Sequence, residues 1–469
     1  MTPTALISAV SLICLAAAAV VLMLAIGIRR RYGPAVLISL SGLAAAVVFL
    51  PAHTAKIAVR ITPLLVFDGY GVVYIALFCA AGAATVLLSW GYFKNFPDER
   101  EEFYLLLLLA VLGASVLAVS DHFASLFLGL EILSVSLYGL IGYPRRTRAH
   151  VEAAVKYLVL AAVSSAFLLF GMALFYAGSG SMQIGQVTLL LAAGGGRWLF
   201  AGSAMIVVAV GFKLAVVPFH LWTPDVYQGA PAPVAGFVAT VSKGAVVALL
   251  LRLFPPADLP PALVVAFALL AAASMIAGNL LALLQNNVKR LLAYSSIAHM
   301  GYLLVAFVSG GDLAAEAVTF YLATYFVTSL GAFGIVILLS DSEKDAEDLE
   351  DYRGLFWRQP WLAGVLAVMM LSLAGLPLTA GFPGKFYLVA AGVAGARWAL
   401  VVILVAASTI GLYYYLRVVA VLFARREENP QPAAIPPLAG RITVGVLTLL
   451  LVWLGVLPGT AIEAIRAML

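Results

Sequence analysis

Apolar residues form stretches of about 20 positions that recur along the whole chain, separated by short polar loops. A stretch of this length crosses a bilayer as a helix, whereas strands of a membrane barrel show shorter segments of alternating polarity. The pattern therefore predicts an all-α polytopic membrane protein. We count about fourteen such stretches, at roughly 4–27, 34–51, 70–93, 102–119, 122–143, 151–177, 199–222, 233–254, 261–284, 290–309, 316–340, 361–392, 397–424 and 442–466.

Proline interrupts two of these stretches. The seventh contains Pro218 within GFKLAVVPFH, and the twelfth contains Pro377 and Pro383 within LAGLPLTAGFPGKF. Each stretch also carries one lysine close to its break, Lys213 and Lys385. Paired broken helices in two halves of a chain indicate a transporter-like site in an inverted repeat, because unwound backbone in a membrane needs a cavity that satisfies it. We expect two inverted repeats of about five helices each.

This pattern divides the chain into four parts. Three transmembrane helices fill residues 1–101, and the first repeat, helices 4 to 8, fills residues 102–254. The second repeat, helices 9 to 13, fills residues 261–424, and a loop followed by the last helix fills residues 425–469.

The loop charges predict how the helices are oriented. Of 27 Lys and Arg residues, sixteen fall in loops on one side of the expected membrane and six on the other. The positive-inside rule places the richer side in the cytoplasm and both termini outside. No Lys or Arg precedes the first stretch and Arg29, Arg30 and Arg31 follow it, so we expect a retained helix. We interpret the acidic segment 340–354 as a solvated cytoplasmic loop, with a contact to a partner as the alternative.

The overall composition supports membrane insertion. Hydrophobic residues make up 64% of the chain and charged residues 10%, a balance outside the range of soluble domains. Five basic residues nevertheless lie within the stretches: Lys156, Lys213, Lys243, Lys385 and Arg417. Each costs about 2.5–3.5 kcal/mol at a helix centre by insertion scales, which favours a function for them. Arg417, near the inner end of its stretch, is expected to extend to the interface.

Lys213 and Lys243 are predicted to lie level with each other near mid-membrane. Each is nine or ten residues, or roughly 14–15 Å of helical rise, from the same inner loop. A lysine in such a poorly hydrated place has a charge that its neighbours can switch. If Glu131 and Lys156 lie about 10 Å away, a unit charge there is worth about 1.7 kcal/mol at an effective dielectric near 20.

Glu131 is the one carboxylate well inside a stretch, in SLFLGLEILSVSLYGL. It needs a cationic partner, and we expect Lys156 on the next, antiparallel helix to supply it. The alternative is a static ion pair that only fixes helix packing.

His299, in AYSSIAHMGYLL, is a candidate proton relay between Lys243 and Lys385, with a core histidine as the alternative. His220 lies near the inner end of the broken seventh stretch. A functional role and simple exposure to loop water explain it equally well.

Redox chemistry is not expected in this chain. The two cysteines, Cys14 and Cys79, both lie in apolar stretches and cannot supply a metal or iron–sulfur ligand set. We also find neither a phosphate-binding loop nor a nucleotide-binding glycine fingerprint. The basic character comes from loop arginines and does not indicate nucleic-acid binding, so any cofactor is expected to belong to a partner.

Five segments carry a resemblance to a known family: GFKLAVVPFHLWTPDVYQGAPAPV, LFLGLEILSVSLYGLIGY, SSIAHMGYLLVA, YRGLFWRQP and LSLAGLPLTAGFPGKFYL. They resemble the N subunits of the proton-pumping NADH:quinone oxidoreductase, respiratory complex I, which belong to the antiporter-like subunits. The resemblance extends from the first stretch to about residue 424. It implies fourteen helices with two inverted five-helix repeats, and both termini on the periplasmic side of a bacterial inner membrane.

The resemblance also implies roles for residues and partners. The family's essential glutamate falls on Glu131, its modulating lysine on Lys156, its central lysines on Lys213 and Lys243, and its terminal lysine on Lys385. Neighbouring antiporter-like and small membrane subunits, membrane lipids and protons are the implied partners, and FMN and iron–sulfur clusters are expected in partner subunits. Two alternatives remain at this point: a subunit of a cation/proton antiporter or membrane-bound hydrogenase, and a structural membrane spacer.

Overall fold

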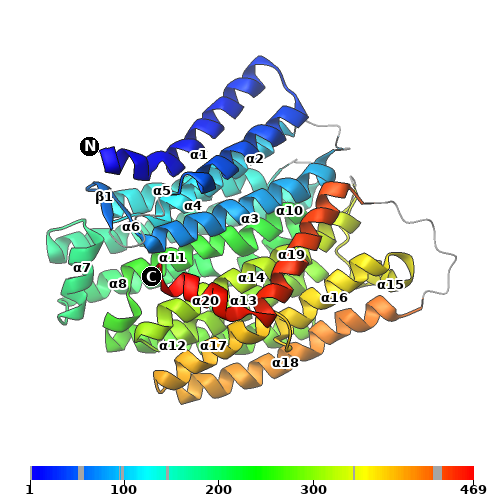
Figure 1. The fold of residues 1–469 in the computed structure, drawn as a ribbon. Helices are drawn as coiled ribbons and strands as arrows, with labels where there is room; N and C mark the ends of the chain where they lie inside the picture. The colour runs from blue at the N-terminus through cyan, green and yellow to red at the C-terminus, as the bar shows by residue number, and fades with distance from the viewer. Residues whose placement is uncertain are drawn as a thin grey trace.

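The fold is a bundle of long helices with one small β-hairpin at its edge (Figure 1). The computed structural model describes residues 3–50, 58–94, 96, 100–143, 147–341, 344–425 and 436–469. Both termini lie toward the end of the bundle that carries the hairpin, which we name the terminal end (Figure 1). We name the opposite end the loop end. Lys56, Arg145, Arg146 and Arg426, counted above among the loop cations, lie outside the described residues.

The described chain crosses the bundle fourteen times, as the sequence predicts. The first six crossings are single helices: α1 (Pro3–Ile28), α2 (Tyr32–Val48), α3 (Gly69–Phe93), α4 (Glu101–Ala118), α5 (Phe123–Ile141) and α6 (Arg148–Ser179). The seventh joins α8 (Arg197–Leu214) to α9 (Trp222–Gly229), and the eighth is α10 (Ala232–Phe237), the π-helix η2 (Val238–Ser242) and α11 (Lys243–Leu253). The others are α12 (Pro261–Leu283), α13 (Val288–Phe307), α14 (Asp312–Leu339), α16 (Pro360–Ala374) with α17 (Gly381–Ala394), α18 (Trp398–Phe423) and α19 (Leu438–Val456).

Short elements complete the described chain. They are the antiparallel hairpin of β1 (Val59–Thr62) and β2 (Leu65–Phe67), α7 (Ile184–Ala192), the 3₁₀ turns η3 (Pro256–Asp258) and η4 (Leu349–Tyr352), α15 (Leu355–Arg358) and α20 (Pro458–Arg466). The hairpin is not predicted from the sequence. The last stretch, predicted as one helix over 442–466, divides at Pro458 into α19 and α20, because proline cannot continue the hydrogen-bond ladder.

Two equivalent helix pairs reveal the inverted repeat. In the first half, α4 packs against α5 through Gly113 and Gly129, and a Cβ on either glycine would lie within 3.0 Å of the other helix's backbone. In the second half, α12 packs against α13 in the same way through Gly278 and Gly301. Since α4 begins at the loop end and α12 at the terminal end, the two pairs are oppositely directed in the bundle.

Each of the two broken helices is interrupted at a residue whose backbone dihedral angles lie in the left-handed region. Helix α8 is followed directly by Ala215, whose φ is 61°, and helix α16 by Gly375, whose φ is 89°. Side chains bind the freed backbone groups: Trp222 Nε1 donates to the carbonyl of Phe212 at 3.0 Å, and the amide of Gly381 donates to Ser372 Oγ at 3.0 Å. The sequence prediction of two interrupted helices is therefore confirmed.

Gly381 offers a test of the second break. A Cβ at this position would lie 1.7 Å from the carbonyl oxygen of Ser372, which is backbone and cannot turn away. We expect Gly381→Ala to destabilise the protein by more than about 3 kcal/mol and to reduce the amount inserted into membranes. The matched control is Gly364→Ala on α16, where nothing lies within 4 Å of the new Cβ. Quantifying both variants in isolated membranes checks this; equal amounts would contradict it.

Candidate functional site

Several groups of polar side chains lie in the interior between the two broken helices. We name them together the polar row; its members are Glu131, Ser165, Ser134, Lys213, Lys243, Ser296, Tyr325, His299 and Lys385. All but Glu131 among its titratable members are buried.

The first part of the row joins α5, α6 and α8. Glu131 Oε1 accepts a 2.6 Å hydrogen bond from Ser165. One helical turn further along α5, Ser134 Oγ accepts a 2.8 Å bond from Lys213 Nζ. Lys213 lies in the last turn of α8 beside the break, and its Nζ is 5.8 Å from the ring centre of Tyr157. Glu131 therefore lies one helical turn from the hydroxyl that accepts from Lys213.

Lys243 lies at the centre of the bundle. It is the first residue of α11, directly after the π-helical turn, and its exposed fraction is 0%. Its Nζ donates to Ser296 Oγ on α13 at 2.7 Å, and Ser296 also accepts from the hydroxyl of Tyr325 at 2.6 Å. π-Helical turns inside helices are frequent at functional positions because they re-aim the residues that follow.

His299 lies between Lys243 and Lys385, as the sequence analysis expects. Its Nδ1 is 2.7 Å from the hydroxyl of Tyr321 and its Nε2 is 3.1 Å from that of Tyr415. Its ring centre is 5.4 Å from that of Tyr325, on the Lys243 side. On the other side it is 5.5 Å from the ring of Tyr302, and the Nζ of Lys385 is 5.2 Å from that ring.

Lys385 binds the open end of the second broken helix. Its Nζ donates to the carbonyls of Leu373 and Ala374, at 2.8 and 2.9 Å, and to Ser408 Oγ at 2.8 Å. The two carbonyls are the last of α16, where the helix dipole places partial negative charge. The ammonium is therefore held by dipoles.

Three lysines of the row are buried without a carboxylate partner. Within the described chain, no carboxylate lies within 4.0 Å of the ammonium of Lys213, Lys243 or Lys385. An unpaired buried ammonium is costly, and its charge depends strongly on small changes around it. A chain of hydroxyl, imidazole and amine groups in this state is chemically suited to accept and release protons.

Lys156 does not pair with Glu131, contrary to the expectation from the sequence. Its Nζ lies 2.8 Å from Glu152 and 2.9 Å from Asp225. The reason is directional: helical side chains tilt toward the N-terminus of their own helix. Because α5 and α6 are antiparallel, Glu131 tilts toward the terminal end and Lys156 toward the loop end.

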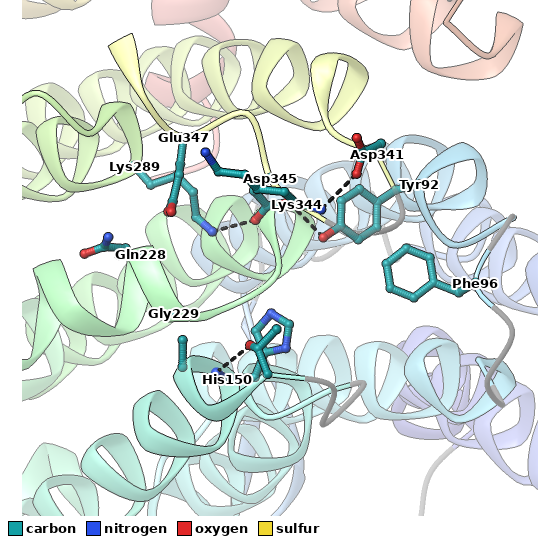
Figure 2. Close-up of a pocket in the computed structure, with 12 residues that line it drawn as sticks. Tyr92, Phe96, His150, Gln228, Gly229, Lys289, Asp341, Lys344, Asp345 and Glu347 are labelled. Atoms are coloured by element: carbon teal, nitrogen blue, oxygen red, sulfur yellow. Dashed lines mark hydrogen bonds and ion pairs between the residues drawn. The ribbon is translucent and has the colours of Figure 1, made fainter. Parts of the chain in front are cut away.

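The acidic segment after α14 is also only partly solvated. Asp345 accepts from Lys289 Nζ at 2.6 Å and from the hydroxyl of Tyr92 at 2.8 Å, and the side chains of Lys289 and Asp345 are 2% and 9% exposed. These residues line a cavity of about 180 Å³ at the loop end (Figure 2). The sequence analysis missed this buried ion pair, although Lys289 at the start of α13 needs an acidic partner.

The two remaining candidates lie near the loop end. The guanidinium of Arg417 donates to the carbonyls of Leu283 and Gln285, at the end of α12, which fits the expected extension toward the interface. His220 lies in the turn between α8 and α9 and is 9% exposed. Within the described chain, neither side chain forms a hydrogen bond or an ion pair with a member of the polar row.

Comparisons with known proteins agree on one family. A family model described as NADH:quinone oxidoreductase/Mrp antiporter, TM, matches residues 120–411. The NADH-quinone oxidoreductase subunit N of Ectopseudomonas mendocina (strain ymp) is 48% identical, over 98% of this chain and 96% of that protein.

Solved structures show the same similarity. A chain of respiratory complex I from Thermus thermophilus, solved with bound aureothin, is 38% identical with a TM-score of 0.85, covering 98% of this chain and 100% of that one. A chain of the Mrp complex from Dietzia sp. DQ12-45-1b has a TM-score of 0.87 over 99% of this chain and 97% of that one. At 18% identity, the second match supports the fold alone.

Proposed function

The chain belongs to the subunit N family of NADH-quinone oxidoreductase, the antiporter-like membrane subunits of respiratory complex I, and we propose that its polar row carries protons through the membrane. The observation that supports this proposal is the set of buried lysines without carboxylate partners that lie, with hydroxyl groups and His299 among them, between two broken helices. Electron transfer takes place elsewhere in the complex, so this subunit contributes ion movement and no redox step.

Each residue of the row has a proposed role. Glu131 sets the charge state of Lys213 electrostatically, since Ser134 on the same helix face holds the ammonium. Lys213 and Lys243 exchange protons in the first repeat and at the centre. His299 relays them to Lys385, from which they leave toward the terminal end. Lys156 lies outside the polar row, bound to Asp225, and acts on the row through its charge.

The loop end is proposed to face the cytoplasm. Basic residues collect there in the sequence count, and both termini lie at the other end (Figure 1). The termini would then be periplasmic. The division into residues 1–101, 102–254, 261–424 and 425–469 remains a proposal, supported by the matching glycine-packed pairs of the two repeats.

Cofactors are proposed to reside in partner subunits. Among the described residues, no group of three or more His, Cys, Asp or Glu side chains is placed to hold a metal ion. We propose that FMN and iron–sulfur clusters belong to other subunits. The alternative of a cation/proton antiporter subunit is matched among solved structures by the Mrp complex chain at 18% identity, which supports a shared fold only. A chain of the archaeal membrane-bound sulfane sulfur reductase, at 24% identity, likewise supports the fold alone.

Replacing Glu131 tests the role of its charge. We expect Glu131→Ala to lower NADH-driven proton uptake about tenfold, since a unit charge about 10 Å away is worth about 1.7 kcal/mol at an effective dielectric near 20. Glu131→Asp should be milder because it keeps the charge. Proton uptake in inverted vesicles, per amount of assembled complex, is the measurement. Glu463→Gln, an exposed carboxylate on α20, is the control; near-normal uptake in Glu131→Ala would refute the role.

A further inference from the structure

Asp225 is bound by two cations that come from different halves of the bundle. Its Oδ2 lies 2.9 Å from Lys156 Nζ on α6, in the first repeat. Its Oδ1 lies 2.8 Å from Arg290 Nη1 on α13, in the second repeat. Asp225 itself belongs to α9, the second part of the broken seventh crossing. One carboxylate therefore connects the broken helix, the lysine of α6 and the helix that carries Ser296 and His299.

Close packing sets the position of this carboxylate. Helix α9 meets α6 at Gly229, where an added Cβ would lie 2.6 Å from the Cβ of Ala153 and 2.9 Å from the carbonyl of Ala149. Only glycine permits this approach, and it brings Asp225 within reach of Lys156. The position of Asp225 is thus fixed by the backbone and not by a flexible loop.

Lys156 is held away from Glu131 in this arrangement. Its ammonium is turned toward Glu152, one turn nearer the loop end. Ser165, which binds Glu131, lies nine residues in the other direction along α6, about 13 Å of helical rise. Measured along α6, Asp225 therefore lies on the loop-end side of Lys156 and Glu131 on its terminal-end side.

Water has access to this cluster of charges. Asp225, Lys156 and Glu152 line a cavity of about 270 Å³, and the side chains of Lys156 and Asp225 are 42% and 39% exposed. The cavity adjoins the one beside Lys289 and Asp345, because Gln228, Gly229 and Glu347 line both (Figure 2). Ion pairs that contact water exchange partners more readily than buried ones, since solvent replaces the lost contact.

We propose that Asp225 is a positioning residue that holds Lys156 at the loop end and ties its position to the second repeat through Arg290. When Arg290 takes the carboxylate alone, Lys156 keeps only the exposed Glu152 of its own helix as a partner, and its charge turns more easily toward the Glu131 side of α6. A change in the second repeat thereby alters the charge near Lys213 without direct contact. This inference rests on the proposed function, since it assumes that the charge of Lys156 acts on the polar row.

Replacing Asp225 in the assembled complex tests the inference. We expect Asp225→Asn to lower NADH-driven proton uptake per assembled complex about fivefold, within the range of coupled sites. Asp225→Glu should restore most of the uptake because it keeps the charge, which a merely space-filling role would not require. Glu350→Gln, which removes an exposed carboxylate 70% open to water at the same end, should leave uptake unchanged.

Arg290 provides a second, independent variant. Arg290→Gln alone should lower uptake, and combining it with Asp225→Asn should add little, because both changes break the same connection. Full uptake in Asp225→Asn, no recovery in Asp225→Glu, or additive losses in the double variant would each overturn the inference. If instead Lys213→Arg pumps normally, the proposed function itself fails, so the two failures are distinguishable.

Discussion

Replacing Lys213 by arginine is expected to lower NADH-driven proton uptake at least tenfold, nearly as far as replacement by alanine. Arginine keeps the positive charge but cannot release its proton, whereas alanine removes both charge and proton. A fixed charge beside Ser134 would be served by either cation, but a proton carrier would not. Loss of a group that transfers protons typically costs a factor of about 10²–10⁴.

The measurement compares quinone-dependent NADH oxidation and proton uptake in inverted membrane vesicles. Amounts of assembled complex are verified first, since a buried arginine also needs more space than lysine. Lys94→Arg, at an exposed lysine where α3 ends, is the matched control and should behave as the unmodified protein. A fixed-charge role predicts instead that Lys213→Arg works and Lys213→Ala fails.

Lys385 is expected to show a different response to the same two replacements. Lys385→Ala leaves the carbonyls of Leu373 and Ala374 without their donor, and each buried group left unpaired costs about 1–3 kcal/mol. We therefore expect fewer assembled complexes as well as poor pumping. Lys385→Arg keeps donors for these carbonyls, so it should assemble but fail to release protons.

The control for Lys385 is Ser408→Ala, which removes one of its three acceptors and leaves the lysine in place. It should retain most of the pumping activity. The readout is proton uptake per NADH oxidised in vesicles with known amounts of complex. If Lys385→Ala and Lys385→Arg both keep full stoichiometry, the lysine serves only to close the end of α16.

The positions of the membrane-spanning helices can be predicted from the sequence because a bilayer allows few backbone structures. A helix must span a fixed thickness with its own hydrogen bonds satisfied, so length and polarity alone locate the crossings. Pro218 and Pro377 likewise mark the two breaks. The intramembrane lysines are recognisable as candidate functional residues because a charged side chain inside a membrane costs free energy.

Side-chain partners are harder to predict. The pairing of Glu131 with Lys156 assumed that adjacent helices suffice, but the opposite tilt of side chains on antiparallel helices separates the two groups. The tilt rule was available from the sequence. Asp225 could also have been suspected as a carboxylate following a broken helix, although its contact with Arg290 depends on how α9 packs against α13.

Two features of the structure are not predicted by the sequence around them. The π-helical turn at Val238–Ser242 lies in an ordinary apolar sequence, and it arises where the central helix must fit between neighbours on every side. The ion pair of Glu316 with Arg466 joins residues 150 positions apart at the terminal end. Such contacts follow from the assembled bundle and not from any segment alone.

The central claim is that buried lysines of this subunit carry protons and do not merely present charge. The most direct test is the number of protons pumped per NADH oxidised by purified complex in proteoliposomes, with Lys213→Arg beside the Lys94→Arg control. The account predicts a ratio clearly below that of the unmodified complex for Lys213→Arg and an unchanged ratio for Lys94→Arg. An unchanged ratio in fully assembled Lys213→Arg complex would contradict it.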